Sequence, residues 1–390
     1  MHALKLAFDY RLSEGHQLKT FSKQYFGLSR QQLGSAIGGR KKLTEEVLIA
    51  ISKKLNIPLS FFDIEVDVPE PIKNIERRIL EKNVFNEKTE ISHIIATVLT
   101  CYNTLVKYIS EHYTVPEFNK ELTNIVPNNF VIKDNKIICC EENKEILNVF
   151  IDNFVSYFNA KNKYFGNIFN ILESNGIFVF SFVNNVWYSE FNSHFLLTDK
   201  NPIIFIERSS SVTEQRILLL KELSEILCCK KYGKNVCLNH YLKQRFAFRV
   251  LLQDGMINSI SSEVYNYEKI CKTMRMFNVS AKCVLFRLKD LNRIDIEDYK
   301  LHEASKAIEK YYHFVYLKEI DDLKSGVYDC AKCNDHSTLL KKIEDSLNKN
   351  HKSWEYVANS VGLTLFDINQ FCFNIDSNIE NTVENNLKFI

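Results

Sequence analysis

Apolar residues recur every three or four positions along most of the chain, the spacing that predicts helices with one buried face. The repeat is clearest over residues 44–55 and 88–112. Uninterrupted apolar runs, IFVFSF at 177–182 and IIFIE at 203–207, predict buried strands instead. We therefore expect an α+β protein that is mostly helical.

Residues 1–62 carry the pattern of five short helices. One begins at Ser29, a good N-cap residue, and another begins at Thr44. The first 60 residues hold ten basic and four acidic side chains, a net charge of +6, and the other 330 residues carry a net −4. A basic head on a mildly acidic body is typical of a nucleic-acid-binding module attached to another domain.

The segments FGLS at 26–29 and LTEEVLIAISKKLNIPLSFF at 43–62 resemble the Xre/Cro family of repressors. The resemblance implies a lambda-repressor-like helix-turn-helix domain over 1–62, whose helix at 29–37 enters the major groove of double-stranded DNA. Arg and Gln suit guanine and adenine edges, and the basic residues after the helix suit phosphates. The residues implied in DNA binding are Ser29, Arg30, Gln31, Gln32, Ser35, Arg40, Lys41 and Lys42. The alternative is a five-helix interaction domain with a solvated basic face.

A short acidic stretch with two prolines, 63–71, indicates a domain boundary, and we assign 63–165 to a connector. The helix expected over 88–112 serves either dimerisation or an ordinary core. Two short strands are expected about a turn at Asp134-Asn135, followed by helices over 145–158 and 165–173. We see no chemistry in this region.

The region 166–294 begins with a helix that stops at Gly176, before the strand at 177–182. Further strands are expected in NVWYSEF, HFLLTD and IIFIE, then a helix over 213–229 and another from about Asn239. With LKQRFAFRVLLQD and NVSAKCVLFRLKDL, these segments resemble ImmA/IrrE-type metallopeptidases. The resemblance implies a central zincin-like α/β domain.

In such a peptidase the first of these helices carries HExxH, whose two histidines leave one helix face toward a single zinc ion. By the resemblance, Lys221 and Glu225 hold the histidine positions, Leu242 holds the third-ligand position, and only the general base Glu222 is kept. Catalytic zinc needs three protein ligands. The resemblance therefore implies a pseudo-metallopeptidase with no enzyme activity and no cofactor. The five residues in the HExxH position are Lys221, Glu222, Leu223, Ser224 and Glu225.

Two interpretations of Glu222 remain open. It lies at the helix surface in a charge pair, or it belongs to a polar cleft that binds a ligand. In the second case Lys221 presents a cation to an anionic ligand, which Glu222 and Glu225 orient.

The region 295–390 is expected to be helical, with helices over 297–313, 337–347 and 353–360. The stretch WEYVANSVGLTLFDINQF has the rhythm of a second helix-turn-helix, but it lacks basic groove residues, which favours simple packing. Cys330, Cys333 and His336 have the C-x2-C-x2-H spacing of half a zinc or iron–sulfur site. A lone C-x2-C is a weak signal, and the alternative is a turn between helices.

These features together predict a DNA-binding transcriptional regulator, taken as a repressor, that binds as a homodimer. Its inactive body senses an effector molecule or docks a protein partner. Two alternatives are a protease that cleaves a partner repressor, and an antitoxin or phage-type repressor controlled by a protein inducer. With no secretion signal or membrane segment in the sequence, and with scattered cysteines expected to be thiols, we predict a cytoplasmic protein.

Overall fold

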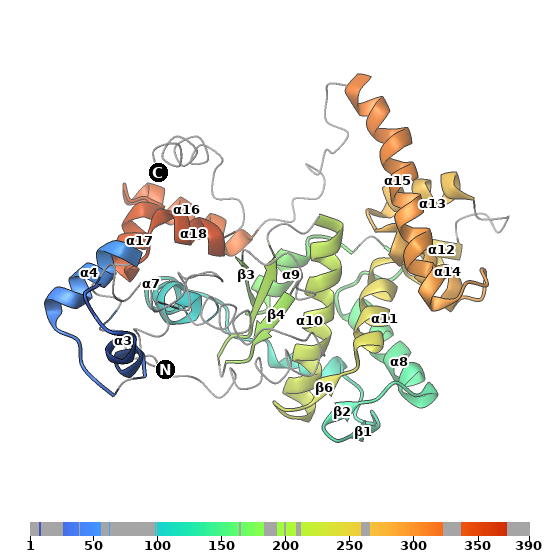
Figure 1. Ribbon diagram of the computed structural model, residues 1–390. Helices are drawn as coiled ribbons and strands as arrows, with labels where there is room; N and C mark the ends of the chain where they lie inside the picture. The colour runs from blue at the N-terminus through green and yellow to red at the C-terminus, as the bar shows by residue number, and fades with distance from the viewer. Residues whose placement is uncertain are drawn as a thin grey trace. The chain divides into compact units, whose positions relative to one another are not determined.

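The computed structural model describes residues 8, 26–38, 40–55, 62, 98, 100–163, 165–182, 193–198, 200–207, 212–258, 266–322 and 337–372. The described chain is mostly helical and contains two three-stranded sheets (Figure 1). The mostly helical α+β class expected from the hydrophobic pattern is therefore confirmed.

The chain forms two compact units, each built from segments that are distant in sequence. Unit 1 comprises Met1–Glu117, Glu173–Ser209 and His336–Ile390, and unit 2 comprises Phe118–Leu172 and Ser210–Asp335. This division differs from the four consecutive segments of the sequence prediction, with boundaries after 62, 165 and 294. In particular, the strands over 178–207 belong to unit 1, whereas the helices that follow them over 212–322 belong to unit 2. Hydrophobic periodicity indicates which face of a helix or strand is buried, but not which other segment covers that face. It therefore does not reveal how distant segments are divided between the two units.

The sheet of unit 1 has the order β3-β5-β4. Strand β3 (Phe178–Phe182) pairs in parallel with β5 (Ile203–Glu207), and β4 (Ser193–Leu196) pairs antiparallel with β5. The described side chains of β4 are buried, as are those of β5 apart from its half-buried last residue, which explains apolar runs without alternation. Strands predicted in IFVFSF, HFLLTD and IIFIE are thus confirmed, and NVWYSEF lies outside the described residues.

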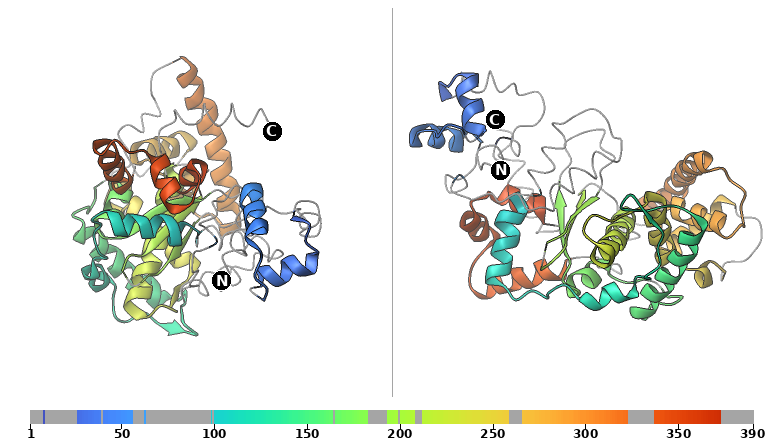
Figure 2. Two further views of the ribbon diagram at one scale, coloured as in Figure 1. Left: turned by 90° about the vertical axis from the view of Figure 1, so that its left-hand side faces the viewer. Right: turned by 90° about the horizontal axis from the view of Figure 1, so that it is seen from below.

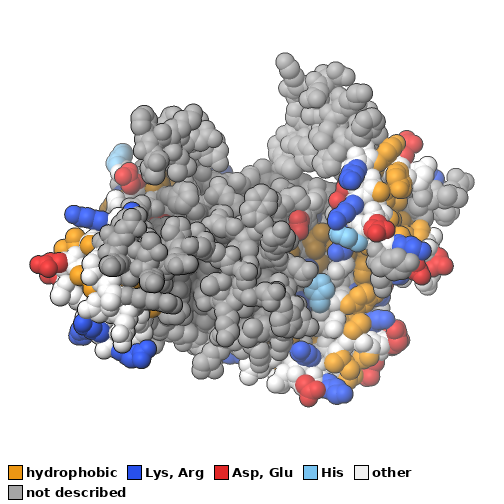
Figure 3. Space-filling view, in the orientation of Figure 1, with side chains coloured by type: hydrophobic (Ala, Val, Ile, Leu, Met, Phe, Trp, Pro, Cys, Tyr) orange, Lys and Arg blue, Asp and Glu red, His pale blue; other side chains and the backbone are white. Residues whose placement is uncertain are grey.

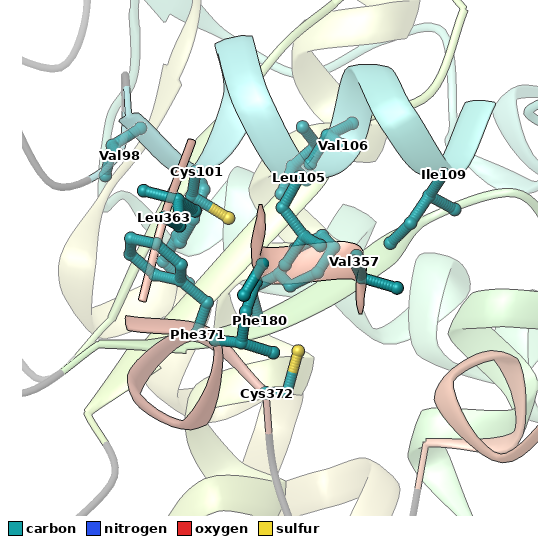
Figure 4. Packing of buried hydrophobic residues seen from close by; sticks show 14 of the residues in the cluster. Val98, Cys101, Leu105, Val106, Ile109, Phe180, Val357, Leu363, Phe371 and Cys372 are labelled. Atoms are coloured by element: carbon teal, nitrogen blue, oxygen red, sulfur yellow. The ribbon is translucent and has the colours of Figure 1, made fainter. Parts of the chain in front are cut away.

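The helices of unit 1 contribute to one apolar core. Figure 4 shows the part of it that is formed by residues of 98–109, by Phe180 and by residues of 357–372. Ile109 of the central helix and Val357 of the C-terminal region are both fully buried in it, together with Phe371. Both views of Figure 2 show the C-terminal helices beside the teal helix α7. These helices are α3 (Arg30–Ile37), α4 (Glu45–Leu55), the π-helix η2 (Tyr102–Val106), α7 (Lys107–His112), α16 (Thr338–Lys349), α17 (Trp354–Val361) and α18 (Leu365–Phe371).

This core bears on two predictions, the helix over 88–112 and the stretch WEYVANSVGLTLFDINQF. Val98, Leu105 and Ile109, from the apolar face predicted for 88–112, are buried within unit 1, as the core-helix alternative requires. Trp354, Val357, Leu363, Ile368 and Phe371 of WEYVANSVGLTLFDINQF are also buried, and α18 contacts β3. The packing interpretation of that stretch is confirmed.

The small sheet of unit 2 has the order β1-β2-β6. Strands β1 (Ile132–Lys133) and β2 (Lys136–Ile137) form a hairpin, and β6 (Cys237–Leu238) adds in parallel to β2. Asp134 and Asn135, at φ 50° and 59°, make the turn in the left-handed conformation that Asp and Asn tolerate best. The hairpin predicted at this dipeptide is confirmed.

The helices of unit 2 confirm those predicted from the sequence, with shifted ends. The helix expected over 213–229 extends from 212 to 232, and the helix expected from about Asn239 begins at His240 with Asn239 as its N-cap. The described helices are η3 (Lys120–Ile125), α8 (Glu141–Tyr157), α9 (Ile168–Ser174, which crosses the unit boundary), α10 (Val212–Tyr232), α11 (His240–Leu251), α12 (Asp254–Asn258), α13 (Tyr267–Phe277), α14 (Ala281–Asp290) and α15 (Asp298–Asp322).

Candidate functional site

Helix α3 begins where the sequence predicts, because a reciprocal capping box fixes its first turn. The hydroxyl of Ser29 accepts the N–H of Gln32 at 3.2 Å, and Oε1 of Gln32 accepts the N–H of Ser29 at 2.8 Å. The side-chain amide oxygen of Gln32 is therefore already hydrogen-bonded to the backbone of Ser29. Gln31, the other glutamine implied in base recognition, takes no part in this capping box.

The two faces of α3 differ as a groove-binding helix requires. Leu33 and Ala36 are fully buried in the core of unit 1, whereas Gln31 and Gln32 are exposed and Ser35 is half-buried. The side chain of Arg30 lies outside the described residues.

A basic segment follows α3 directly. Arg40, Lys41 and Lys42 are all exposed, and Figure 3 shows Lys and Arg side chains on the visible surface of the segment that holds α3 and α4. Glu45 and Glu46, also exposed, come next in the first turn of α4, where acidic side chains favour the helix dipole. The structure therefore has an exposed cationic stretch shortly after the C-terminal end of α3.

In unit 2, the KELSE stretch lies in the middle of α10, which is buried along most of its length. Glu222 is 5% exposed and Glu225 is 3% exposed, whereas Lys221 is half-buried. Of the two interpretations of Glu222, the one that places it at the helix surface is wrong. The reason is that α10 packs against α11, η3 and β6, which cover several sides of the helix.

Glu225 forms an ion pair with Lys243 on the neighbouring helix α11. Nζ of Lys243 donates to Oε2 of Glu225 at 2.6 Å, and the two side chains are 9% and 3% exposed. Lys243 directly follows Leu242, which is completely buried. Sequence reasoning missed Lys243; the available signal was that a glutamate on an otherwise buried helix requires a cation on the element that covers it.

The side chains at the three implied ligand positions do not fit a zinc ion. Lys221 offers an ammonium group, Leu242 offers no donor atom, and Oε2 of Glu225 is hydrogen-bonded to Lys243. Within the described ranges, no group of three or more His, Cys, Asp and Glu residues is arranged to hold a metal. Cys330, Cys333 and His336 lie outside those ranges, so the site suggested there stays a prediction.

A second polar network joins α11, α12 and α14. Arg287, fully buried, donates from Nε to the carbonyl of Leu252 at 2.9 Å and forms ion pairs with Asp254 and Asp290. Burial lowers the pKa of the Arg287 guanidinium, and the two carboxylates oppose that shift. Arg249 also pairs with Asp254, at 3.1 Å. Both carboxylates of this network, Asp254 and Asp290, form ion pairs with arginines, so we interpret the network as a structural one that holds α11, α12 and α14 together.

No protein-family model, curated protein or solved structure matches the chain. Among the described helices, none is both long enough and apolar enough to span a bilayer.

Proposed function

We propose that the protein is a sequence-specific DNA-binding repressor with a catalytically inactive, ImmA/IrrE-like body. The observation that carries the proposal is the helix α3. Its start is set by the Ser29–Gln32 capping box, Gln31 is exposed in its first turn, and the exposed segment Arg40–Lys42 follows it. Base-reading groups on a fixed helix, with cations beside it for phosphates, are what recognition of duplex DNA requires.

The body contributes regulation in this proposal. The burial of Glu222 and the engagement of Glu225 by Lys243 argue against metal-dependent peptide hydrolysis, because neither the ligands nor an accessible base is offered. A body without catalysis retains the capacity to bind, and we propose that it senses an effector or docks a protein partner. The repressor binds DNA as a homodimer, since helix-turn-helix heads recognise paired half-sites.

Genomic DNA selection with the full-length protein tests the proposal. The wild type is compared with the double variant Arg30→Ala/Gln31→Ala, and with the matched control Lys53→Ala/Lys54→Ala at the far end of α4. We expect wild type and control to recover the same discrete sites and the α3 variant to lose them. Recovery of unselected fragments by all three proteins contradicts the repressor.

A further inference from the structure

The ion pair between Glu225 and Lys243 joins two helices that pack closely along their lengths. Ile226 and Leu242, the chain neighbours of the two residues, are fully buried, as is Phe246 one turn further along α11, and Glu222, one turn earlier on α10, is only 5% exposed. The cation and the anion are therefore held together in a region from which water is largely excluded.

A buried ion pair has a distinctive energetic character. Desolvation of the two charges offsets most of their attraction, so the pair adds little net stability over apolar side chains of similar size. Removal of only one partner is costly, because the other charge is left buried without compensation. Such a pair thus specifies the alignment of two elements more strongly than it stabilises them.

The helix α11 is held at both ends as well as at Lys243. The side chain of Asn239 accepts the N–H of Tyr241 at its N-terminus, and Arg249 pairs with Asp254 beyond its C-terminus. These contacts fix where α11 begins and ends, and the Glu225–Lys243 contact fixes how it meets α10. A metal ion that bridges two helices performs the same mechanical task.

We propose that the Glu225–Lys243 ion pair is the cross-brace that replaces a metal ion between α10 and α11. The ammonium group of Lys243 occupies the carboxylate of Glu225 and repels a divalent cation, so the body holds its fold without metal. The proposal rests on the peptidase-like body of the proposed function, and it does not depend on DNA binding by the head.

Metal analysis and thermal unfolding of the purified full-length protein test the brace. We expect far less than one zinc per chain and the same Tm with and without EDTA. Glu225→Leu and Lys243→Met should each lower Tm by roughly 10 °C, whereas the double variant Glu225→Leu/Lys243→Met should recover most of that loss. Lys300→Met, which breaks the exposed pair with Glu297, is the control and should shift Tm by less than about 3 °C.

The outcomes separate this proposal from the proposed function. Stoichiometric zinc, or a Tm that falls on chelation, overturns the brace. So does a double variant that is as unstable as the sum of the single ones. If a single variant does not fold, the double variant alone decides, because the proposal requires that it fold. Loss of the expected DNA selectivity refutes the repressor and leaves the brace intact.

Discussion

Ser337 donates its hydroxyl proton to Oε1 of Glu173, a residue 164 positions earlier in the chain. The other oxygen of the same carboxylate accepts the N–H of Leu339 at 2.8 Å. Glu173 is only 4% exposed, and a buried charge needs compensation. The N-terminus of α16 provides it, because the helix dipole there favours an anion. This contact ties two of the separate segments of unit 1 together.

We expect Glu173→Gln to destabilise the protein by about 2 kcal/mol. The amide of glutamine turns one acceptor into a donor that faces the Ser337 hydroxyl or the Leu339 N–H, and it removes the charge that caps α16. Urea denaturation followed by circular dichroism measures the change. Glu355→Gln, at an exposed position in the first turn of α17, is the control. Equal midpoints for both variants would show that the buried cap contributes nothing.

Asn143 is the second buried polar residue with a clear structural task. It is fully buried; its Oδ1 accepts the N–H of Val131, and its Nδ2 donates to the carbonyls of Val131 and Ile138, each at 2.8 Å. Asn143→Ala leaves these backbone groups without that partner, and we expect a loss of about 2–3 kcal/mol in unfolding free energy. The exposed neighbour change Glu142→Ala should cost less than about 0.5 kcal/mol. A null result for Asn143→Ala in the same denaturation assay would contradict this role.

The fully buried thiol of Cys283 predicts a loss of stability in alkali. Burial raises its pKa from 9.0 to about 12, although Arg287 and Arg216 act in the opposite direction. Between these two pH values the unfolded chain releases the proton and the folded chain retains it. The free energy of unfolding therefore falls as pH rises through this window, by at most about 1.4 kcal/mol per pH unit, and the full contribution is present below it.

Cys283→Ala should remove this part of the pH dependence, whereas Cys139→Ala, at an exposed thiol, should not. Denaturation midpoints measured across the window decide the matter. Parallel curves for wild type and Cys283→Ala would exclude Cys283 as a source of alkaline instability.

The exposed lysines after α3 predict a salt dependence. If Lys41 and Lys42 each neutralise one phosphate, their replacement by alanine reduces the slope of log affinity against log salt by about 2. Fluorescence anisotropy with a selected DNA site, over a range of salt concentrations, measures the slope. The variant Lys53→Ala/Lys54→Ala should keep the wild-type slope. A slope that is unchanged in both variants would rule out phosphate contacts by Lys41 and Lys42.

Local structure was largely predictable from the sequence, because its determinants lie within a few residues. Ser29 caps α3, and Asn239 caps α11. Gly176, at φ 73°, follows the end of α9 as a helix stop should. Ser29 and Asn239 each accept a nearby backbone N–H, and Gly176 adopts a positive φ that its missing side chain permits. The residue type and its position are therefore enough to predict these helix ends.

Contacts between distant segments were not predictable in this way. The surface interpretation of Glu222 was plausible because a charged residue ordinarily remains solvated, but the helices and strand packed around α10 exclude water from it. Lys243 carried no signal of its own, since its role depends on the approach of α11 to Glu225. The pairing of β6 with β2 across 100 residues was likewise absent from any local pattern.

The sequence by itself determined where most of the described helices and strands form, and it indicated a capped helix at 29–37 that is followed by basic residues. Only the tertiary structure decided that the strands at 178–207 join the C-terminal helices in unit 1, and that Lys243 closes the carboxylate of Glu225. The physical reason is the range of the forces involved. Backbone hydrogen bonding and capping act over a few residues, whereas the compensation of buried charge and apolar surface depends on whichever segments meet in space.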